Sequence, residues 1–234
     1  MGLSTHAQKP TRFGGGLPLS KYWLLLLALP VLAALAFAIF QPIQVLPRIS
    51  LAPGFSFTDQ HDVRLTSDDL RGKLVYYTFM YTGCDADCAQ TVQGLKVIQQ
   101  AVDEAGSSVP IEFVAISFDP QRDTAERLRH FATEQGLDGE HWHLVTGDPV
   151  QLKNVIGAGF GAYYEQTDDG AFRFDPMYVL VDGWGIQRAF YRTPLPDPAR
   201  IVRDINFITK ELENSEGLNR LAYEAAHLFL CYPD

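Results

Sequence analysis

Cys84 and Cys88 are the side chains in this sequence with the clearest capacity for chemistry. They lie at the start of a predicted helix over 85–105, directly after a strand-like run over 74–80. Residues four apart share one helix face, so the two sulfurs can form a reversible disulfide or hold one metal ion. Peptide dipoles at a helix N-terminus lower the pKa of a thiol, whereas the two intervening aspartates oppose that effect. Two thiolates select Cu(I) or Zn(II), although a static disulfide or two unrelated core cysteines also fit the spacing.

The elements that must position this pair alternate along the chain. β-Branched, aromatic or alternating runs predict strands over 55–58, 63–66, 74–80, 111–117, 176–182 and 186–191. Helical patterns cover 85–105, 124–135 and 198–213, with a shorter stretch from Asp148 towards Ile156. Asp123 is a candidate N-cap, and Gly136 a stop, for the second of these helices. Strands that alternate with helices, and end in a hairpin and a helix, predict an α/β sandwich.

The net charge of the chain argues against one class of binding partner. The 234-residue chain has a formal charge of −9, which argues against a nucleic-acid-binding protein, because such proteins need a basic surface. All 28 acidic residues lie at or after Asp59, whereas 4 of the 19 basic residues precede it, so residues 59–234 carry −13. Three cysteines are too few for a disulfide scaffold. We therefore expect one working pair, with Cys231 as a buried spectator thiol.

An uncharged apolar run over Tyr22–Phe40 predicts a transmembrane helix, because its 19 residues match the thickness of a hydrocarbon core. Lys9, Arg12 and Lys21 precede this run, and the acidic residues follow it. The positive-inside rule then places the N-terminus in the cytoplasm and the domain on the extracytoplasmic side of the cytoplasmic membrane. The alternative is a signal peptide cleaved after Ala38.

Five segments follow from these patterns: a cytoplasmic N-terminal segment (1–21), a membrane anchor (22–40), a proline-rich linker (41–54), the α/β domain (55–214) and a helical tail (215–234). The tail carries apolar residues that can pack on the domain, on a partner or on the membrane surface. These are Leu221, Ala225, Leu228 and Phe229.

Three segments in order resemble the SCO/SenC family. They are Phe79–Cys88 (FMYTGCDADC), Ser117–Thr124 (SFDPQRDT), similar to S-x-D-P-x-R-D-T, and Trp142–Gly147 (WHLVTG), similar to W-x-x-L-T-G. The resemblance extends over roughly 53–213 and implies a thioredoxin-like fold, with a central mixed sheet flanked by helices. It also implies a membrane-anchored copper protein that helps to assemble the copper centre of cytochrome c oxidase, with Cys84 and Cys88 as thiol ligands of the copper.

The resemblance is incomplete at the third copper ligand. The family supplies a histidine just before the strand that ends in D-x-x-G, and alignment on Asp182–Gly185 places Phe174 at that position. A phenyl ring has no donor atom, so the two thiolates alone are expected to hold Cu(I) but to hold Cu(II) poorly. Met177, His141 and His143 are alternative third ligands if a loop folds over the pair.

Two other features bear on the cysteine pair. Pro176 precedes a predicted strand, much as the cis-proline of redox-active thioredoxins does, so it is a candidate cis-proline beside the pair. A trans proline that begins a strand is the alternative. Asp119, Arg122 and Asp123 either line the cysteine cleft or form a capped helix start with a local ion pair.

Together these features predict a copper metallochaperone or thiol reductase that acts on the cytochrome c oxidase copper centre through Cys84 and Cys88. There are two alternatives: a thiol-disulfide oxidoreductase without copper, and a non-catalytic accessory subunit of a respiratory complex. Whether the chain is an enzyme depends on which of these functions it has. The expected partners are an oxidase subunit or another respiratory complex and, through the N-terminal helix, the membrane. No nucleic-acid partner is expected.

Overall fold

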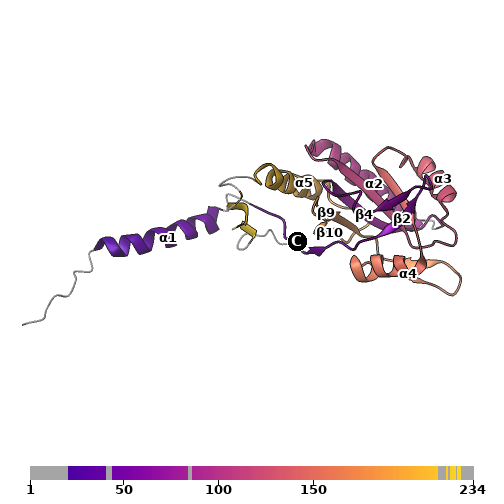
Figure 1. Ribbon diagram of the computed structural model, residues 1–234, viewed down its shortest axis with the longest axis horizontal. Helices are drawn as coiled ribbons and strands as arrows, with labels where there is room; N and C mark the ends of the chain where they lie inside the picture. The colour runs from indigo at the N-terminus through magenta and orange to yellow at the C-terminus, as the bar shows by residue number, and fades with distance from the viewer. Residues whose placement is uncertain are drawn as a thin grey trace, which may run out of the picture. The chain divides into compact units, whose positions relative to one another are not determined.

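The three-dimensional structure is a computed structural model that describes residues 21–40, 44–83, 86–215, 220, 222–224, 226 and 227. Within these ranges, the side chains of residues 21–25, 34, 37, 38, 40 and 86–88 are left undescribed. The chain divides into two compact units, Met1–Pro42 and Ile43–Asp234 (Figure 1).

The first unit contains helix α1 (Lys21–Phe40), which includes Pro30. Its described side chains are apolar and exposed, and Leu26, Leu29 and Ile39 are 67%, 68% and 73% accessible. Over the residues that the structure describes, no helix is both long enough and apolar enough to cross a membrane. A helix is present over 21–40, close to the predicted range 22–40. The structure does not support the prediction that this helix spans a membrane.

An eight-stranded mixed sheet forms the centre of the second unit. Its strands, in spatial order, are β1 (Ser50–Leu51), β10 (Ile186–Tyr191), β9 (Tyr178–Val181), β4 (Leu74–Met80), β5 (Ile111–Ser117), β6 (Trp142–Thr146), β2 (Ser56–Asp59) and β3 (Arg64–Thr66). β4, β5 and β6 run parallel, and the other neighbours pair antiparallel. All residues of β4 and β5 are buried, as expected for central strands covered on both faces.

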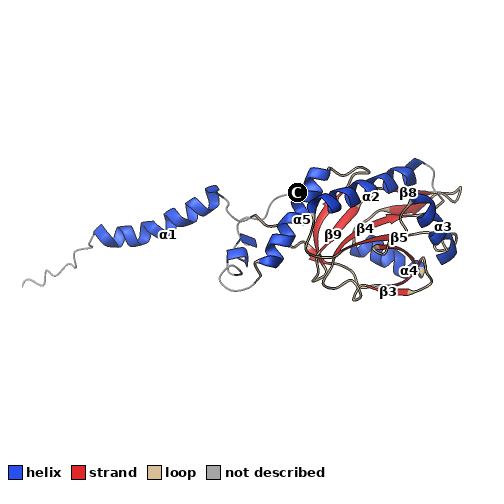
Figure 2. Ribbon diagram, turned by 90° about the horizontal axis from the view of Figure 1, so that it is seen from above, coloured by secondary structure: helices blue, strands red, loops and turns tan. Residues whose placement is uncertain are grey.

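Helices cover both faces of this sheet, as Figures 1 and 2 show. α2 (Ala86–Ala105), α3 (Ala125–Gln135) and α5 (Pro198–Glu213) enclose one apolar core with the sheet. α4 (Pro149–Leu152) and the π-helix η1 (Lys153–Gly159) enclose a second core on the opposite face. A separate two-stranded hairpin, β7 (Tyr164–Gln166) and β8 (Phe172–Phe174), follows η1. The layers are those of the predicted α/β sandwich.

Helix α2 approaches the sheet closely at Gly94. A Cβ atom at this position would overlap the Tyr178 hydroxyl and the Pro194 carbonyl oxygen. The Tyr178 hydroxyl also donates hydrogen bonds to the carbonyl oxygens of Thr91 (3.0 Å) and Pro194 (3.1 Å). Only glycine therefore allows this contact, which fixes the axis of the helix that carries Cys88.

The bounds of several elements match the predictions, and others differ. β4, β5, β10 and α5 have the predicted bounds. The N-cap of α3 is Thr124, whose Oγ1 accepts from Arg127 N, and Gly136 ends the helix in the left-handed conformation. The predicted cap, Asp123, is wrong because its carboxylate is engaged elsewhere, as described below. The hairpin β7–β8 was not predicted.

The stretch predicted as a linker is packed on the second unit from residue 44 onwards. Val45 and Leu46 are fully buried, and β1 pairs with β10. Arg188, on β10, donates to the carbonyl oxygens of Leu46 (2.9 Å) and Pro47 (3.2 Å). These contacts anchor the stretch because they satisfy backbone groups and bury apolar side chains at once.

A group of charged and ionisable side chains, which we name the Glu211 node, joins four parts of the second unit. Asp182, Arg188 and Glu211 are buried, whereas Arg48 is exposed. Its members are Arg48, Asp182, Arg188, Glu211 and His227. Arg188 pairs with Asp182 (2.9 Å) and Glu211 (2.6 Å), and Glu211 also contacts Arg48 (2.8 Å) and His227 Nε2 (2.8 Å). The node thus ties the segment before β1, strand β10, helix α5 and the tail together.

The predicted helical tail is described only at 220, 222–224, 226 and 227, and these residues are helical. Ala226 is fully buried, so the tail packs against the second unit at this point. The apolar tail residues predicted to mediate contacts, and the spectator thiol, lie outside the described residues. They are Leu221, Ala225, Leu228, Phe229 and Cys231.

Candidate thiol site at the start of helix α2

The predicted site lies where β4 leads through Tyr81–Gly83 into α2. Cys88 falls in the first turn of α2, as predicted, but its side chain is not described. Cys84 lies outside the described residues. The C-terminal ends of parallel strands are the usual position of ligand sites in open α/β sheets. The placement of Cys88 therefore agrees with the prediction, and the position of Cys84 and the geometry of the two sulfurs stay predictions.

A buried carboxylate holds the loop that leads to Cys84. Asp123 is fully buried and accepts hydrogen bonds from Thr82 N (2.9 Å), Thr82 Oγ1 (2.5 Å) and Ser117 Oγ (2.6 Å). Arg127, on α3, donates to Thr82 Oγ1 (3.0 Å). Hydrogen bonds to an ionised carboxylate are shorter and stronger than neutral ones. The residue two before Cys84 is therefore fixed by groups on β5, α3 and the segment between them.

Five rings form a cluster beside this loop, which we name the aromatic cluster. It consists of Tyr81, Phe118, Tyr164, Phe172 and Phe174. Phe174 is 8% exposed, and its ring centroid lies 5.3 Å from that of Phe118 and 6.2 Å from that of Tyr81. Phe174, the residue that the sequence resemblance places at the expected histidine position, is thus a buried ring in contact with Tyr81. The ring packs there and cannot ligate a metal.

Arg122 fastens the β7–β8 hairpin to this cluster. Its guanidinium carbon lies 5.7 Å from the ring centroids of both Tyr81 and Phe172. The same side chain pairs with Asp119 and donates to the carbonyl oxygen of Gly170 (2.7 Å), in the hairpin turn. The sequence left two alternatives for Asp119, Arg122 and Asp123: residues that line the cysteine cleft, or a capped helix start with a local ion pair. Both are partly correct. Asp119 and Arg122 form the local ion pair, whereas Asp123 contacts the cysteine loop.

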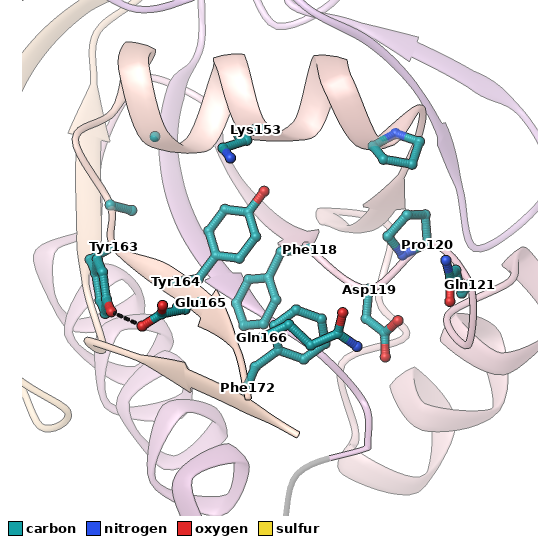
Figure 3. A pocket seen from close by; sticks show the side chains of 13 residues that line it. Phe118, Asp119, Pro120, Gln121, Lys153, Tyr163, Tyr164, Glu165, Gln166 and Phe172 are labelled. Carbon is teal, nitrogen blue, oxygen red and sulfur yellow. Dashed lines mark hydrogen bonds between the residues drawn. The ribbon is translucent and has the colours of Figure 1, made fainter. Parts of the chain in front are cut away.

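A pocket of about 500 Å³ opens on the outer side of the aromatic cluster (Figure 3). The rings of Phe118, Tyr164 and Phe172 form its apolar floor, as Figure 3 shows. One wall is the helix formed by α4 and η1, which carries Lys153, and the others are the hairpin and the segment after β5. Burial raises the pKa of the Tyr164 hydroxyl, so this group stays protonated at neutral pH.

Pro176 and Met177 take positions other than those weighed from the sequence. No peptide bond in the described part of the chain is cis, so the candidate cis-proline at Pro176 is wrong, and the alternative of a trans proline before a strand holds. Met177 is buried in the core on the α4 side of the sheet, and its carbonyl oxygen accepts from Thr78 Oγ1 (3.0 Å). The structure therefore assigns Met177 a packing role.

His141 and His143 are directed away from the cysteine loop. His143 Nε2 lies 3.1 Å, and His141 Nδ1 3.6 Å, from the carboxylate of Glu112, on the second residue of β5. Burial alone would raise the pKa of Glu112, but the ion pair with Lys73 (2.9 Å) and the contact with His143 hold it below its usual value. Both histidines are therefore committed to a carboxylate towards the N-terminal ends of the parallel strands. Their role as third copper ligands is not supported.

Within the described side chains, no group of three or more His, Cys, Asp and Glu residues is arranged to hold a metal ion. The sequence offers two thiols at the start of α2, with the carboxylates of Asp85 and Asp87 between them, and Phe174 adds no donor. Soft thiolates are donors that copper accepts.

The aromatic cluster is the part of the site that sequence reasoning missed. A signal for it exists, because Tyr164, Phe172 and Phe174 follow the alternation of two short strands, on either side of a turn with two aspartates and Gly170. The role of Asp123 was one of two open alternatives. Its hydrogen bonds to Thr82 place it against the cysteine loop, and a contact between segments so far apart cannot be read from local sequence.

The mixed sheet, with Cys88 in the first turn of the helix that follows β4, has the arrangement of a thioredoxin-like protein. The family model described as SCO1/SenC matches residues 45–210, which is well over half of the chain. The protein therefore belongs to the SCO1/SenC family.

Two relatives illustrate the range of similarity. A SCO1 protein homolog from Bacillus subtilis is 23% identical over 93 residues, which are 40% of this chain and 47% of that protein. A protein from Stutzerimonas stutzeri, described as copper-binding, is 27% identical over 156 residues, which are 64% of this chain and 74% of that protein. This chain thus spans about half the length of the first relative and about three quarters of the second.

Solved structures share the fold. Arabidopsis thaliana ScoI with copper bound aligns with a TM-score of 0.60 and 23% identity, over 69% of this chain and 99% of that one. BsSco, a member of the Sco family of cytochrome c oxidase assembly proteins in which a disulfide switch was identified, aligns with a TM-score of 0.59 and 18% identity. That alignment covers 70% of this chain and 96% of that one. Both confirm the thioredoxin-like fold.

Proposed function

We propose that this protein is a Sco-type assembly factor for the copper centre of cytochrome c oxidase, and that its chemistry is thiol–disulfide exchange by Cys84 and Cys88. The observation that carries the choice of chemistry is Phe174. The resemblance in sequence places Phe174 where the family has its histidine ligand, and Phe174 is a buried ring without a donor atom. In this proposal the pair therefore lacks the donor that would hold oxidised copper. Disulfide exchange needs only the two sulfurs.

In this proposal the reduced pair reduces a disulfide in the target protein. The Cys84 thiolate attacks one target sulfur, which forms a mixed disulfide and releases the other target sulfur as a thiolate. The Cys88 thiolate then attacks the Cys84 sulfur, forms the Cys84–Cys88 disulfide and releases the second target thiolate. Two electrons pass to the target, and protons lost by the two cysteines balance those gained by the target thiols.

Carriage of Cu(I) as cargo is the second candidate function. It is supported by the relative described as copper-binding and by the ScoI structure with copper bound. Two thiolates suffice for Cu(I), so the same cysteines would hold the ion and pass it to target thiols that the exchange reaction had reduced. The two candidates therefore describe successive uses of one pair.

Exchange is tested with the reduced protein and a disulfide-bearing soluble domain of an oxidase copper subunit. We expect the target thiols to appear at the rate at which the Cys84–Cys88 disulfide forms, and Cys88→Ser to accumulate the mixed disulfide on Cys84. Cys231→Ser is the matched control and should react as the wild type does. Copurification with a respiratory complex that survives loss of both cysteines, without any exchange, would instead identify a non-catalytic accessory subunit.

Copper binding is tested by equilibrium dialysis and absorption spectroscopy. The wild type should hold one Cu(I) per chain under reducing conditions and show no thiolate-to-Cu(II) absorption when Cu(II) is added. Phe174→His should gain that absorption, because it restores a nitrogen donor at the third position. Phe172→His, the same change on the same strand, should not. Strong Cu(II) binding by the wild type would contradict the role assigned to Phe174.

Placement of the domain outside the cytoplasmic membrane also remains a proposal. It is supported by the distribution of charge, since basic residues precede the apolar run over 22–40 and all acidic residues follow it. Protease added to intact spheroplasts should cleave the domain of the full chain, whereas a cytoplasmic marker protein should survive. Protection of the domain until lysis would overturn the proposal.

A further inference from the structure

The pocket on the aromatic cluster lies next to the reactive loop in the fold. Tyr81, three residues before Cys84, does not line the pocket, but its ring contacts two rings that do, those of Phe172 (5.1 Å between centroids) and Phe118 (5.4 Å). Phe118 in turn stacks on Tyr164 (4.8 Å, 15° between planes). The floor of the pocket is thus in contact with Tyr81, at the start of the segment that leads to Cys84, and a polypeptide bound there lies beside that segment.

The floor offers apolar surface that the fold leaves uncovered. Tyr164 and Phe172 are only half-buried, although both belong to the cluster. A volume of about 500 Å³ falls in the range of pockets that bind ligands, and aromatic floors contribute strongly to binding because they bury large areas. The pocket therefore suits a large apolar side chain.

The hairpin that forms one wall of the pocket carries mostly negative charge, and Glu165 is the charged residue of this hairpin that lines the pocket. The hairpin and its flanks, residues 163–175, contain four acidic residues and one basic residue. The acidic ones are Glu165, Asp168, Asp169 and Asp175. On the opposite wall Lys153 is one exposed cation, and the charge of Asp119 is balanced by Arg122. Residues 59–234 as a whole carry −13, so a basic partner is favoured at both short and long range.

We propose that this pocket receives a large apolar side chain from a basic segment of the protein whose disulfide the pair reduces. The inference rests on the proposed exchange function and adds the property by which the substrate is recognised. The occupant is a cysteine-bearing polypeptide with lysine or arginine near its cysteine. Acidic polypeptides and small disulfides lack one or both of these features.

The test measures exchange rates with short peptides whose single cysteine is joined to thionitrobenzoate. Reduced protein attacks this mixed disulfide, and release of the coloured thiolate reports the rate. Four peptides combine lysine or glutamate flanks with tryptophan or glycine two residues from the cysteine. Glutathione joined to the same group is the small probe. We expect the lysine–tryptophan peptide to react at least tenfold faster than each of the other three, and its advantage to shrink as salt is raised.

Two variants locate the effect in the pocket. Tyr164→Ala removes floor area, and Glu165→Lys reverses an exposed charge on the wall. Each should lower the ratio of the lysine–tryptophan rate to the glutathione rate at least fivefold. Glu104→Lys makes the same change of charge at the far end of α2, and it should leave both rates unchanged. Because Glu165 is exposed, its variant tests the proposal even if Tyr164→Ala fails to fold.

The outcomes separate this inference from the function on which it rests. If no probe reacts with the cysteine pair, the exchange function itself fails. If all probes react and the four peptides do so at one rate, exchange stands and the pocket proposal is overturned. A fall in the glutathione rate that equals the fall in the peptide rate for both variants would also overturn it, because the pocket would then act only through the loop.

Discussion

At the C-terminal end of β4, one buried carboxylate, Asp123, accepts three hydrogen bonds from neutral donors and holds a loop in place. Near the other end of the same strand, Arg188 pairs with two buried carboxylates, and Glu211 contacts two further cationic or ionisable groups. The first arrangement positions one short segment. The second joins four segments that are distant in sequence.

The difference shows how much the interactions at each end of β4 contribute to the stability of the fold. A buried ion pair that is stripped of one partner leaves an uncompensated charge, so the Glu211 node is needed for the fold. The cysteine end relies on hydrogen bonds and ring contacts of smaller individual energy, and it leaves apolar surface open to a partner. Stability and chemistry are therefore concentrated at opposite ends of the sheet, and four predictions test that division.

The largest effect is expected for Arg188→Ala. Arg188 is fully buried, and its removal leaves Asp182 and Glu211 without their shared partner. The free energy of unfolding should fall by about 3–5 kcal/mol. Urea unfolding monitored by circular dichroism measures this loss. The control Arg129→Ala, on the exposed side of α3, should change the free energy of unfolding by less than about 0.5 kcal/mol. A loss below about 1 kcal/mol for Arg188→Ala would contradict the role of the node.

Acid should weaken the same node. Burial alone would raise the pKa of Glu211, but the contacts with His227, Arg188 and Arg48 lower it to about 2, from 4.5. A lowered folded-state pKa means that the stabilisation is complete above about pH 4.5 and is lost as pH falls towards 2. The stability difference between wild type and Glu211→Gln should therefore shrink by about 3 kcal/mol between pH 5 and pH 2.

Parallel urea titrations at several pH values measure that difference. Glu213→Gln, on the same helix, serves as the control, and its difference from the wild type should stay nearly constant. If the two variants show the same dependence on pH, the low pKa of Glu211 is wrong.

The next effect concerns the cysteine end. Asp123→Ala removes the acceptor for Thr82 N, Thr82 Oγ1 and Ser117 Oγ, so stability should fall by about 2–3 kcal/mol. Because the loop before Cys84 loses its support, the rate of exchange with the glutathione probe should fall about tenfold. Asp123→Asn retains one acceptor oxygen, so its stability and its exchange rate should lie between those of the wild type and those of Asp123→Ala. An unchanged exchange rate in a stable Asp123→Ala protein would show that the loop is positioned by other groups.

The smallest effect is expected for Arg122→Ala. Its contacts with the two rings and with Asp119 are partly exposed to solvent, so the loss should be about 1 kcal/mol. Hydrogen exchange should increase in β7 and β8 and stay unchanged in β4 and β5. Arg192→Ala, which removes another ring contact, with Phe190 (5.4 Å), is the control and should leave the hairpin unaffected. Equal exchange in the hairpin of both variants would show that Arg122 does not fasten it.

The layers of the fold could be predicted because strong local patterns set them. β4, β5 and β10 are β-branched and aromatic runs bounded by breakers, and α5 has an apolar stripe with Asp197 as its N-cap. The β7–β8 hairpin has short strands with weak alternation, so its signal was lost among polar residues. β1 was missed because two residues carry no periodicity, and the proline-rich composition of its surroundings favoured a linker.

The candidate site also has parts that could be predicted from local sequence and parts that could not. The position of the cysteine pair after β4 follows from local sequence, and so does the lack of a donor at Phe174. The aromatic cluster and the burial of Asp123 depend on contacts between segments more than 30 residues apart, such as that between Thr82 and Asp123. Arg188 shows the limit most clearly. A charged residue in a strand is expected to be exposed, and its burial is explained only by its two partners, Asp182 directly after β9 and Glu211 on α5.

The Glu211 node has a mechanical consequence. A force applied to the chain ahead of β1 is transmitted through Leu46, Pro47 and Arg48 to β10 and α5, because their carbonyl oxygens and the guanidinium bind there. The load is thus borne by two hydrogen bonds and an ion pair near the N-terminal end of β4. The loop that leads to Cys84 follows the opposite end of β4 and makes none of these contacts, so we expect tension on the preceding chain to leave the loop unstrained.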